Sequence, residues 1–127
     1  MRLRIFLPHT ELLDTETVKI KAENPMGYFT LKPRHIDMTS TLVPGILSYT
    51  TSTGKTEYLA VDYGLLVKQG DMVKVVSRRA FSGELGKLEA EVRRMTEIED
   101  ERERSARSAV ARLEADFVRR FLEVGRS

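Results

Sequence analysis

Residues 58–77 read YLAVDYGLLVKQGDMVKVVS, and this stretch decides the fold. It contains three short runs rich in apolar and β-branched residues: 58–62, 65–68 and 72–77. The dipeptides Tyr63-Gly64 and Gly70-Asp71 separate these runs and are typical of tight turns. Because strands joined by tight turns pair with their sequence neighbours, the stretch predicts antiparallel hairpins.

The same pattern of short apolar runs separated by turn residues extends back to the N-terminus. Further runs lie at residues 2–7, 17–21, 28–31 and 46–51. Side chains alternate in places, as Val18 and Ile20 do with Lys19, so one face of such a strand is apolar. No helical stretch of ten or more residues intervenes, which argues against parallel strand–helix–strand units. Residues 1–82 are therefore predicted to form a mainly β sandwich or barrel of short antiparallel strands.

The pattern changes after residue 83. No proline occurs between Glu84 and Val124, and apolar residues recur at helical spacing. The two stripes are Leu85, Leu88, Val92 and Met95, then Ala106, Val110, Leu113, Phe117 and Phe121. The charged stretch between them, residues 99–104, has no apolar side chain to bury. We expect a C-terminal α-helical hairpin over residues 83–127, hinged near 100–105, although one continuous helix about 60 Å long is also compatible with the sequence.

Bulk composition narrows the function classes. The 127 residues carry a formal net charge of +2 and no cysteine, so a disulfide framework is excluded and phosphate polymers are poor partners. No apolar run approaches the roughly 18 residues of a membrane span. We therefore expect no nucleic-acid binding and no direct membrane insertion, and any link to a membrane would run through a partner.

Candidate catalytic motifs have simpler explanations. Gly54-Lys55-Thr56 resembles the end of a phosphate-binding loop, but Tyr49 stands where that motif needs glycine, and a hairpin turn is the better interpretation. His9 and His35 are the two histidines, and no other metal-type ligands are grouped with them. The sequence thus predicts no catalytic, cofactor-binding or metal site, and favours an interaction module over an enzyme.

The order of several segments resembles a known family. They are residues 19–22 (KIKA), 27–35 (GYFTLKPRH), 42–47 (LVPGIL), 58–66 (YLAVDYGLL) and 73–76 (VKVV). This order is similar to the epsilon subunit of F-type ATP synthases, the counterpart of the mitochondrial delta subunit, and most closely to its alternate, sodium-type branch. Gly86 and Glu89 stand where some bacterial members carry the Asp and Arg of an ATP-binding motif, so we expect no bound ATP.

The resemblance implies a non-catalytic rotor subunit of the central stalk, which couples ion translocation to ATP synthesis. The sandwich would bind the gamma subunit and rest on the membrane c-ring, at the cytoplasmic face of the bacterial inner membrane. The residues matching the ring-facing loop are Tyr28, Phe29, Leu31, Arg34 and His35. Phe29 and Leu31 could equally fill the core.

By the same resemblance, the tail is a regulatory element that could oppose ATP hydrolysis. Its candidate contacts with acidic surfaces of the alpha/beta head are Arg112, Arg119 and Arg120.

One alternative from another class stays open at this point. A free-standing β-sandwich interaction module could self-associate through a short coiled-coil tail. Each apolar stripe of the tail covers only about two heptads, which is short for that purpose.

Overall fold

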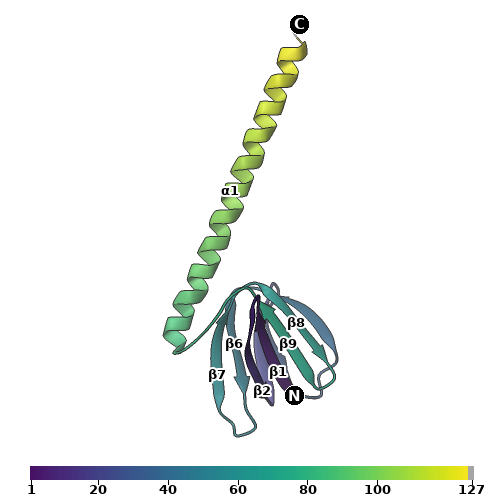
Figure 1. Cartoon of the computed structure of the whole chain (residues 1–127), viewed down its shortest axis with the longest axis vertical. Helices are drawn as coiled ribbons and strands as arrows, with labels where there is room; N and C mark the ends of the chain where they lie inside the picture. Colours follow the sequence, from purple (N-terminus) through teal and green to yellow (C-terminus); the bar gives the residue numbers. More distant parts are fainter. Residues whose placement is uncertain (126–127) are drawn as a thin grey trace. The chain divides into compact units, whose positions relative to one another are not determined.

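The computed structural model describes residues 1–125, with side chains described through residue 120. Over this range the chain forms ten β-strands and one α-helix (Figure 1). The strands are β1 (Arg2–Leu7), β2 (Thr10–Glu16), β3 (Lys19–Asn24), β4 (Gly27–Leu31), β5 (Met38–Leu42), β6 (Gly45–Thr50), β7 (Thr56–Val61), β8 (Gly64–Gln69), β9 (Met72–Ser77) and β10 (Ala80–Ser82). The helix is α1 (Leu85–Gly125).

The strands build two five-stranded sheets. The first has the order β2-β1-β9-β8-β5 and the second the order β10-β7-β6-β3-β4. The described strand pairs are antiparallel, as predicted, except that β1 and β9 run parallel with Leu3 opposite Val73. This pair joins the two ends of the β domain, so no local turn signal in the sequence could reveal it.

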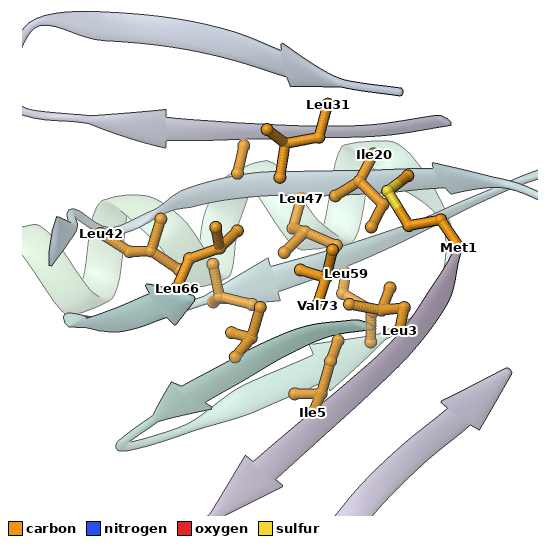
Figure 2. Packing of buried hydrophobic residues seen from close by; sticks show 13 residues of the cluster. Met1, Leu3, Ile5, Ile20, Leu31, Leu42, Leu47, Leu59, Leu66 and Val73 are labelled. Carbon is orange, nitrogen blue, oxygen red and sulfur yellow. The ribbon is translucent and has the colours of Figure 1, made fainter. Parts of the chain in front are cut away.

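One apolar core fills the space between the sheets. Its buried members come from both layers, and Figure 2 shows them pointing toward one another. They are Met1, Leu3, Ile5, Ile20, Ala22, Leu31, Leu42, Leu47, Leu59, Val61, Leu66, Val73 and Val75. Within most strands these residues occupy alternate positions, because successive side chains of a strand point to opposite faces. The predicted β-sandwich is confirmed.

The predicted helical hairpin is wrong, because α1 continues without interruption through the charged stretch at residues 99–104. That stretch contains no glycine or proline, and its Glu and Arg residues have good helix propensity. An ion pair between Arg107 Nη2 and Glu103 Oε1, at 2.8 Å and one turn apart, adds local support. The lack of apolar side chains at residues 99–104 therefore does not indicate a hinge, because an exposed helical segment needs none. Residues 126–127 of the predicted tail and the side chain of Phe121 lie outside the described part.

Contacts divide the chain into two compact units, residues 1–95 and residues 96–127. The first unit includes the opening turns of α1. There Leu88 and Met95 are buried with Ala60 of β7, and Ile46 and Val92 pack against them. The start of the helix is thus anchored on the outer face of the second sheet. Within residues 1–125, no helix has the combined length and apolar character that a bilayer span requires.

Candidate interaction surfaces

The residues predicted to meet the c-ring do not form one surface. Along β4, Tyr28 points outward and is 58% exposed, whereas Phe29 and Leu31 point inward and pack in the core. The alternation of a strand enforces this split. Leu31 is fully buried, so its side chain cannot contact a partner, and its place in the predicted interface is corrected.

Tyr28 also lies far along the strand from Arg34. It borders a groove of about 400 Å³ on the outer face of the second sheet, beside Leu85 and Glu89 of α1. Lys21 Nζ lies 5.0 Å from the centre of its ring. Burial and the nearby negative charge of Glu23 raise the pKa of the Tyr28 hydroxyl. Tyr28 follows the β3–β4 turn, whereas Arg34 follows the other end of β4, so the structure does not bring the two together.

Arg34 and His35 lie in the segment 32–37, which crosses from the second sheet to the first, and both are exposed. The segment is held in place by buried Lys68 of β8, which is 2% exposed. Lys68 Nζ donates to the carbonyl oxygen of His35 at 2.6 Å and to that of Gly70 at 2.8 Å. In return, the backbone N–H of Gly70 donates to Asp37 Oδ1 at 2.8 Å. We call residues 32–37 the crossing loop.

The crossing loop is exposed, and these hydrogen bonds also hold its backbone in one conformation. A short turn inside it, in which the N–H of His35 donates to the carbonyl of Lys32 at 2.9 Å, defines its path further. Ile36 is strongly exposed next to Arg34 and His35. Lys68 was not predicted to hold this loop. Its place two positions after the inward-facing Leu66 puts it on the same face of β8, and a buried lysine needs polar partners.

A second polar anchor, also missed, lies where the chain passes from β9 to β10 and so from one sheet to the other. Buried Asp62 accepts hydrogen bonds from Arg78 Nη2 at 3.2 Å and from Arg79 Nε and Nη2 at 3.0 Å each. The N–H of Tyr63 donates to it at 2.7 Å. Burial alone would raise the pKa of this carboxyl, but these donors outweigh burial and hold the pKa below its ordinary value.

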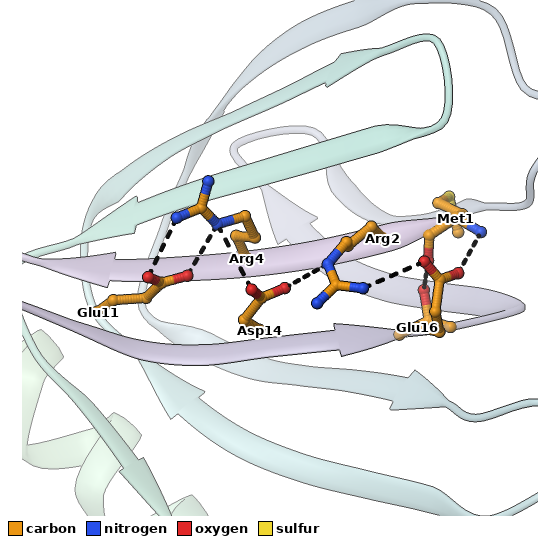
Figure 3. Close-up of polar contacts among 7 residues, drawn as sticks. Met1, Arg2, Arg4, Glu11, Asp14 and Glu16 are labelled. Carbon is orange, nitrogen blue, oxygen red and sulfur yellow. Dashed lines mark hydrogen bonds and ion pairs between the residues drawn. The ribbon is translucent and has the colours of Figure 1, made fainter.

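A ladder of ion pairs joins β1 to the edge strand β2, as Figure 3 shows. Its contacts include Arg2 Nε to Asp14 Oδ1 at 2.6 Å, Arg4 Nε to Glu11 Oε1 at 2.8 Å, and the amino group of Met1 to Glu16 Oε2 at 3.3 Å. Hydrogen bonds from Arg4 and Arg2 lower the pKa values of Glu11 and Asp14. These exposed pairs define register more than they add stability.

The tail residues are placed on the second part of α1. Arg112, Arg119 and Arg120 are exposed, and Arg119 Nη2 lies 3.9 Å from Asp116 Oδ1. The same helix exposes apolar side chains at Val110, Leu113, Phe117 and Val118. This segment thus offers both cationic and apolar groups to solvent.

The hairpin interpretation of residues 54–56 is confirmed. Gly54 adopts a positive φ of 86° in the turn between β6 and β7, and Lys55 Nζ pairs with Glu57 Oε1 at 3.0 Å. Among residues 1–125, no group of three His, Asp or Glu side chains converges on a possible metal position. The geometry is that of a close-packed sandwich with anchored loops and charged strands.

Comparison with known proteins identifies the family. Residues 1–83 match the family model described as the ATP synthase delta/epsilon chain, β-sandwich domain. The chain is similar to "ATP synthase epsilon chain 2" of Cereibacter sphaeroides, with 33% identity over 96% of this chain and 86% of that protein. The protein of the same description from Paraburkholderia xenovorans is 30% identical over 96% of this chain and 90% of that protein. The chain belongs to the ATP synthase delta/epsilon family.

Solved structures agree on the fold. A chain of the Euglena gracilis mitochondrial ATP synthase matches with a TM-score of 0.60 and 20% identity, over 63% of this chain and about half (51%) of that chain. A chain of the central stalk and c-ring of the Tetrahymena thermophila mitochondrial ATP synthase matches with a TM-score of 0.55 and 14% identity. The match covers 75% of this chain and 89% of that chain. Family membership makes the chain a non-catalytic stalk subunit of an ATP synthase, and favours that role over a self-associating module.

Proposed function

We propose that the chain joins the gamma subunit of the central stalk to the c-ring and so helps to couple ion translocation to ATP synthesis. It would lie at the cytoplasmic face of a bacterial inner membrane, held there by its partners. No bond is made or broken in this chain. Its task is mechanical, and the features that matter are stiffness and the shape of its surfaces.

The observation that carries the proposal is the anchored crossing loop. Lys68 and Asp37 tie it to the β8–β9 hairpin, whose inner side chains Leu66, Val73 and Val75 are part of the close-packed core. A loop that is already ordered loses little conformational entropy when it binds. A close-packed interior also deforms little under load. Both properties suit a contact that must hold while the rotor turns.

We assign the ring contact to the crossing loop, with Arg34 and His35 as its polar groups. Arg34 can donate several hydrogen bonds to backbone carbonyls or carboxylates of a polar loop on the ring. Tyr28 is left out of this contact because it lies at the opposite end of β4, next to the start of α1. Phe29 and Leu31 support the contact from inside, as core residues of the same strand.

We assign a regulatory role to the second part of α1. Its exposed apolar side chains and Arg112, Arg119 and Arg120 would bind an acidic surface of the catalytic alpha/beta head and oppose ATP hydrolysis. Exposed helices of this length gain most of their stability from packing against a partner. The helix is therefore suited to exchange one binding surface for another.

The double variant Arg34→Ala/His35→Ala tests the coupling role in vesicles that contain the reconstituted ATP synthase. We expect ATP hydrolysis to persist while ions pumped per ATP fall by about threefold or more, because truncation of an arginine at the centre of an interface can cost about 2 kcal/mol. The matched control is His9→Ala/Lys19→Ala, which removes exposed side chains of similar charge elsewhere on the sandwich. Pumping per ATP that stays at the wild-type value in the crossing-loop variant would reject this assignment.

A further inference from the structure

The second part of α1 carries an exposed apolar face. Residues 103–120 are all exposed, and Val110, Leu113 and Phe117 are 54%, 69% and 71% exposed. Their spacing of three and four residues places them on one side of the helix. Because a helix gains most of its stability by packing its apolar side against a partner, this face is suited to binding one.

Residues 103–120 follow the seven-residue repeat of a coiled coil. In that repeat the a and d positions form the seam between two helices, and the e and g positions flank the seam. The a and d positions here are Glu103, Ala106, Val110, Leu113, Phe117 and Arg120. The inner four are apolar and the outer two carry opposite charges. A matching helix is therefore apolar at its centre, with a base where it meets Glu103 and an acid where it meets Arg120.

A second copy of the same helix, lying antiparallel, has these properties. In an antiparallel pair an a position of one helix faces a d position of the other, and a two-fold axis repeats every contact. In the central register Val110 faces Leu113 of the second copy. Ala106 then faces Phe117 of the second copy, so a small side chain meets a large one and the seam can pack without a gap.

The charges of this register agree at the ends and along the flank. Glu103 of each copy faces Arg120 of the other. Arg107 and Glu114 both occupy e positions, which lie side by side in an antiparallel pair, so Arg107 of each copy meets Glu114 of the other. Arg107 Nη2 lies 2.8 Å from Glu103 Oε1 of its own helix, and its guanidinium has enough donors to serve both acids. Opposite charges therefore meet across the pair at each of these positions.

A parallel pair lacks this match. Parallel helices place identical positions opposite each other, which brings Glu103 against Glu103 and Arg120 against Arg120 in the seam. Like charges at an interface are unfavourable. The two ends of the seam thus select the antiparallel arrangement.

We propose that the free chain pairs with a second copy through an antiparallel coiled coil of residues 103–120. The seam is short, about 27 Å at 1.5 Å per residue, so the pair is weak and separates when the chain enters an ATP synthase. The pair covers Leu113 and Arg120, so a paired chain cannot present them to the catalytic head. This last consequence rests on the proposed regulatory role, whereas the pairing itself does not.

Sedimentation equilibrium of the full-length chain tests the pairing at concentrations from about 5 to about 500 μM, where we expect a dimer with a dissociation constant of about 100 μM or tighter. Val110→Ser removes an apolar side chain from the centre of the seam in both copies and should raise that constant by about tenfold or more. The matched control is Val118→Ser, the same change at equal exposure (55%) on the same helix but outside the a and d positions, which should stay within about twofold of wild type. Circular dichroism checks that both variants keep the helix.

Charge reversal tests the register. Arg107→Glu and Glu114→Arg each place like charges side by side twice in the pair, so each alone should raise the dissociation constant by about fivefold or more. The double variant Arg107→Glu/Glu114→Arg restores opposite charges and should return to within about threefold of wild type. Arg104→Glu, at an outward position of the same helix, should change the constant by less than about twofold.

Each outcome decides the inference without deciding the proposed function. Wild-type chain that stays monomeric over the whole range overturns the pairing and leaves the stalk role in place. A dimer that Val110→Ser does not weaken lies on another surface, and a double charge reversal that fails to restore pairing excludes the antiparallel register. Either result overturns the inference. Loss of coupling activity in reconstituted vesicles, in contrast, bears on the proposed function and leaves the dimer measurement unaffected.

Discussion

Gly64 begins β8 directly opposite Ser77, and its lack of a side chain is a packing requirement. A Cβ atom built at this position would overlap the backbone carbonyl oxygen of Val76. Backbone cannot rotate away as a flexible side chain can. We therefore expect Gly64→Ala to lower the free energy of unfolding by about 1–3 kcal/mol, measured by urea denaturation.

Gly86 provides the matched control for that prediction. A Cβ at Gly86, in the first turn of α1, would meet nothing within 4 Å. Gly86→Ala should leave stability unchanged or raise it by up to about 1 kcal/mol, because alanine favours the helix. Equal effects of the two substitutions would contradict the account of Gly64.

Asp62 gives the chain a specific sensitivity to acid. Its pKa in the folded state lies below the ordinary value, so in acid the unfolded state binds more protons. The stabilisation from this carboxylate is complete above about pH 4 and is lost as the pH falls through the lower, folded-state value. The wild type should therefore lose more stability between pH 7 and pH 3 than Asp62→Asn, which cannot be protonated in this range.

Urea midpoints of the two proteins at both pH values measure this difference. At pH 7, Asp62→Asn should already be less stable by about 1–3 kcal/mol, because charged hydrogen bonds to Arg78 and Arg79 are lost. Parallel pH profiles for the two proteins would show that another carboxylate accounts for the acid sensitivity.

Individual residues show where sequence reasoning succeeded and where it failed. Arg34 and His35 were predicted to contact the c-ring; that contact stays a prediction, and the structure exposes both side chains, as it requires. Leu31 was misplaced because a motif match carries no information about strand alternation. Lys68 and Asp62 were missed because their partners are backbone groups or residues more than a dozen positions away, which a linear pattern cannot reveal.

At the scale of elements, the attachment of α1 depends on its first turns. Leu88 and Met95 are buried against the second sheet, whereas Leu113 is largely exposed. Leu88→Ala should cost about 2–4 kcal/mol of stability. Leu113→Ala on the same helix should cost less than about 0.5 kcal/mol, and serves as control. Similar losses at both positions, measured by thermal or urea unfolding, would contradict the described packing.

The strands that sequence analysis missed share a physical cause. β2, β5 and β10 were not predicted, and each lies at the edge of its sheet. An edge strand such as β2 buries little, so its sequence TELLDTE carries a weak apolar signal. The other strands were all predicted, most of them because their alternate residues fill the core. The helix was predicted from the spacing of its apolar residues. Its continuity through residues 99–104 depends instead on the helix propensity of charged residues, which the apolar pattern does not reveal.

At the scale of the whole chain, the contact pattern predicts where truncation is tolerated. A chain ending at Met95 retains the helical turns that cover Ala60 and Ile46, so it should melt within about 3 °C of the full-length protein. A chain ending at Ser82 exposes those residues and should melt at a clearly lower temperature. Identical melting of the two fragments would contradict the packing of α1 on the sheet.

The same truncation after Met95 tests the regulatory proposal, because it removes Arg112, Arg119 and Arg120 while sparing the sandwich. ATP synthase assembled with this fragment should hydrolyse ATP faster than the enzyme assembled with the full chain. The triple variant Arg112→Ala/Arg119→Ala/Arg120→Ala should show part of the same increase. Unaltered hydrolysis rates in both would reject an inhibitory role for the second part of α1.

Reconstitution tests the central claim most directly: ATP synthase lacking its native subunit of this family is returned to vesicles with or without the chain. Ion pumping is measured per ATP hydrolysed, and the chain alone is assayed for hydrolysis in parallel. Our account predicts that the chain restores pumping per ATP and hydrolyses nothing by itself. Pumping that is the same with and without the bound chain would contradict its role as the link between stalk and ring.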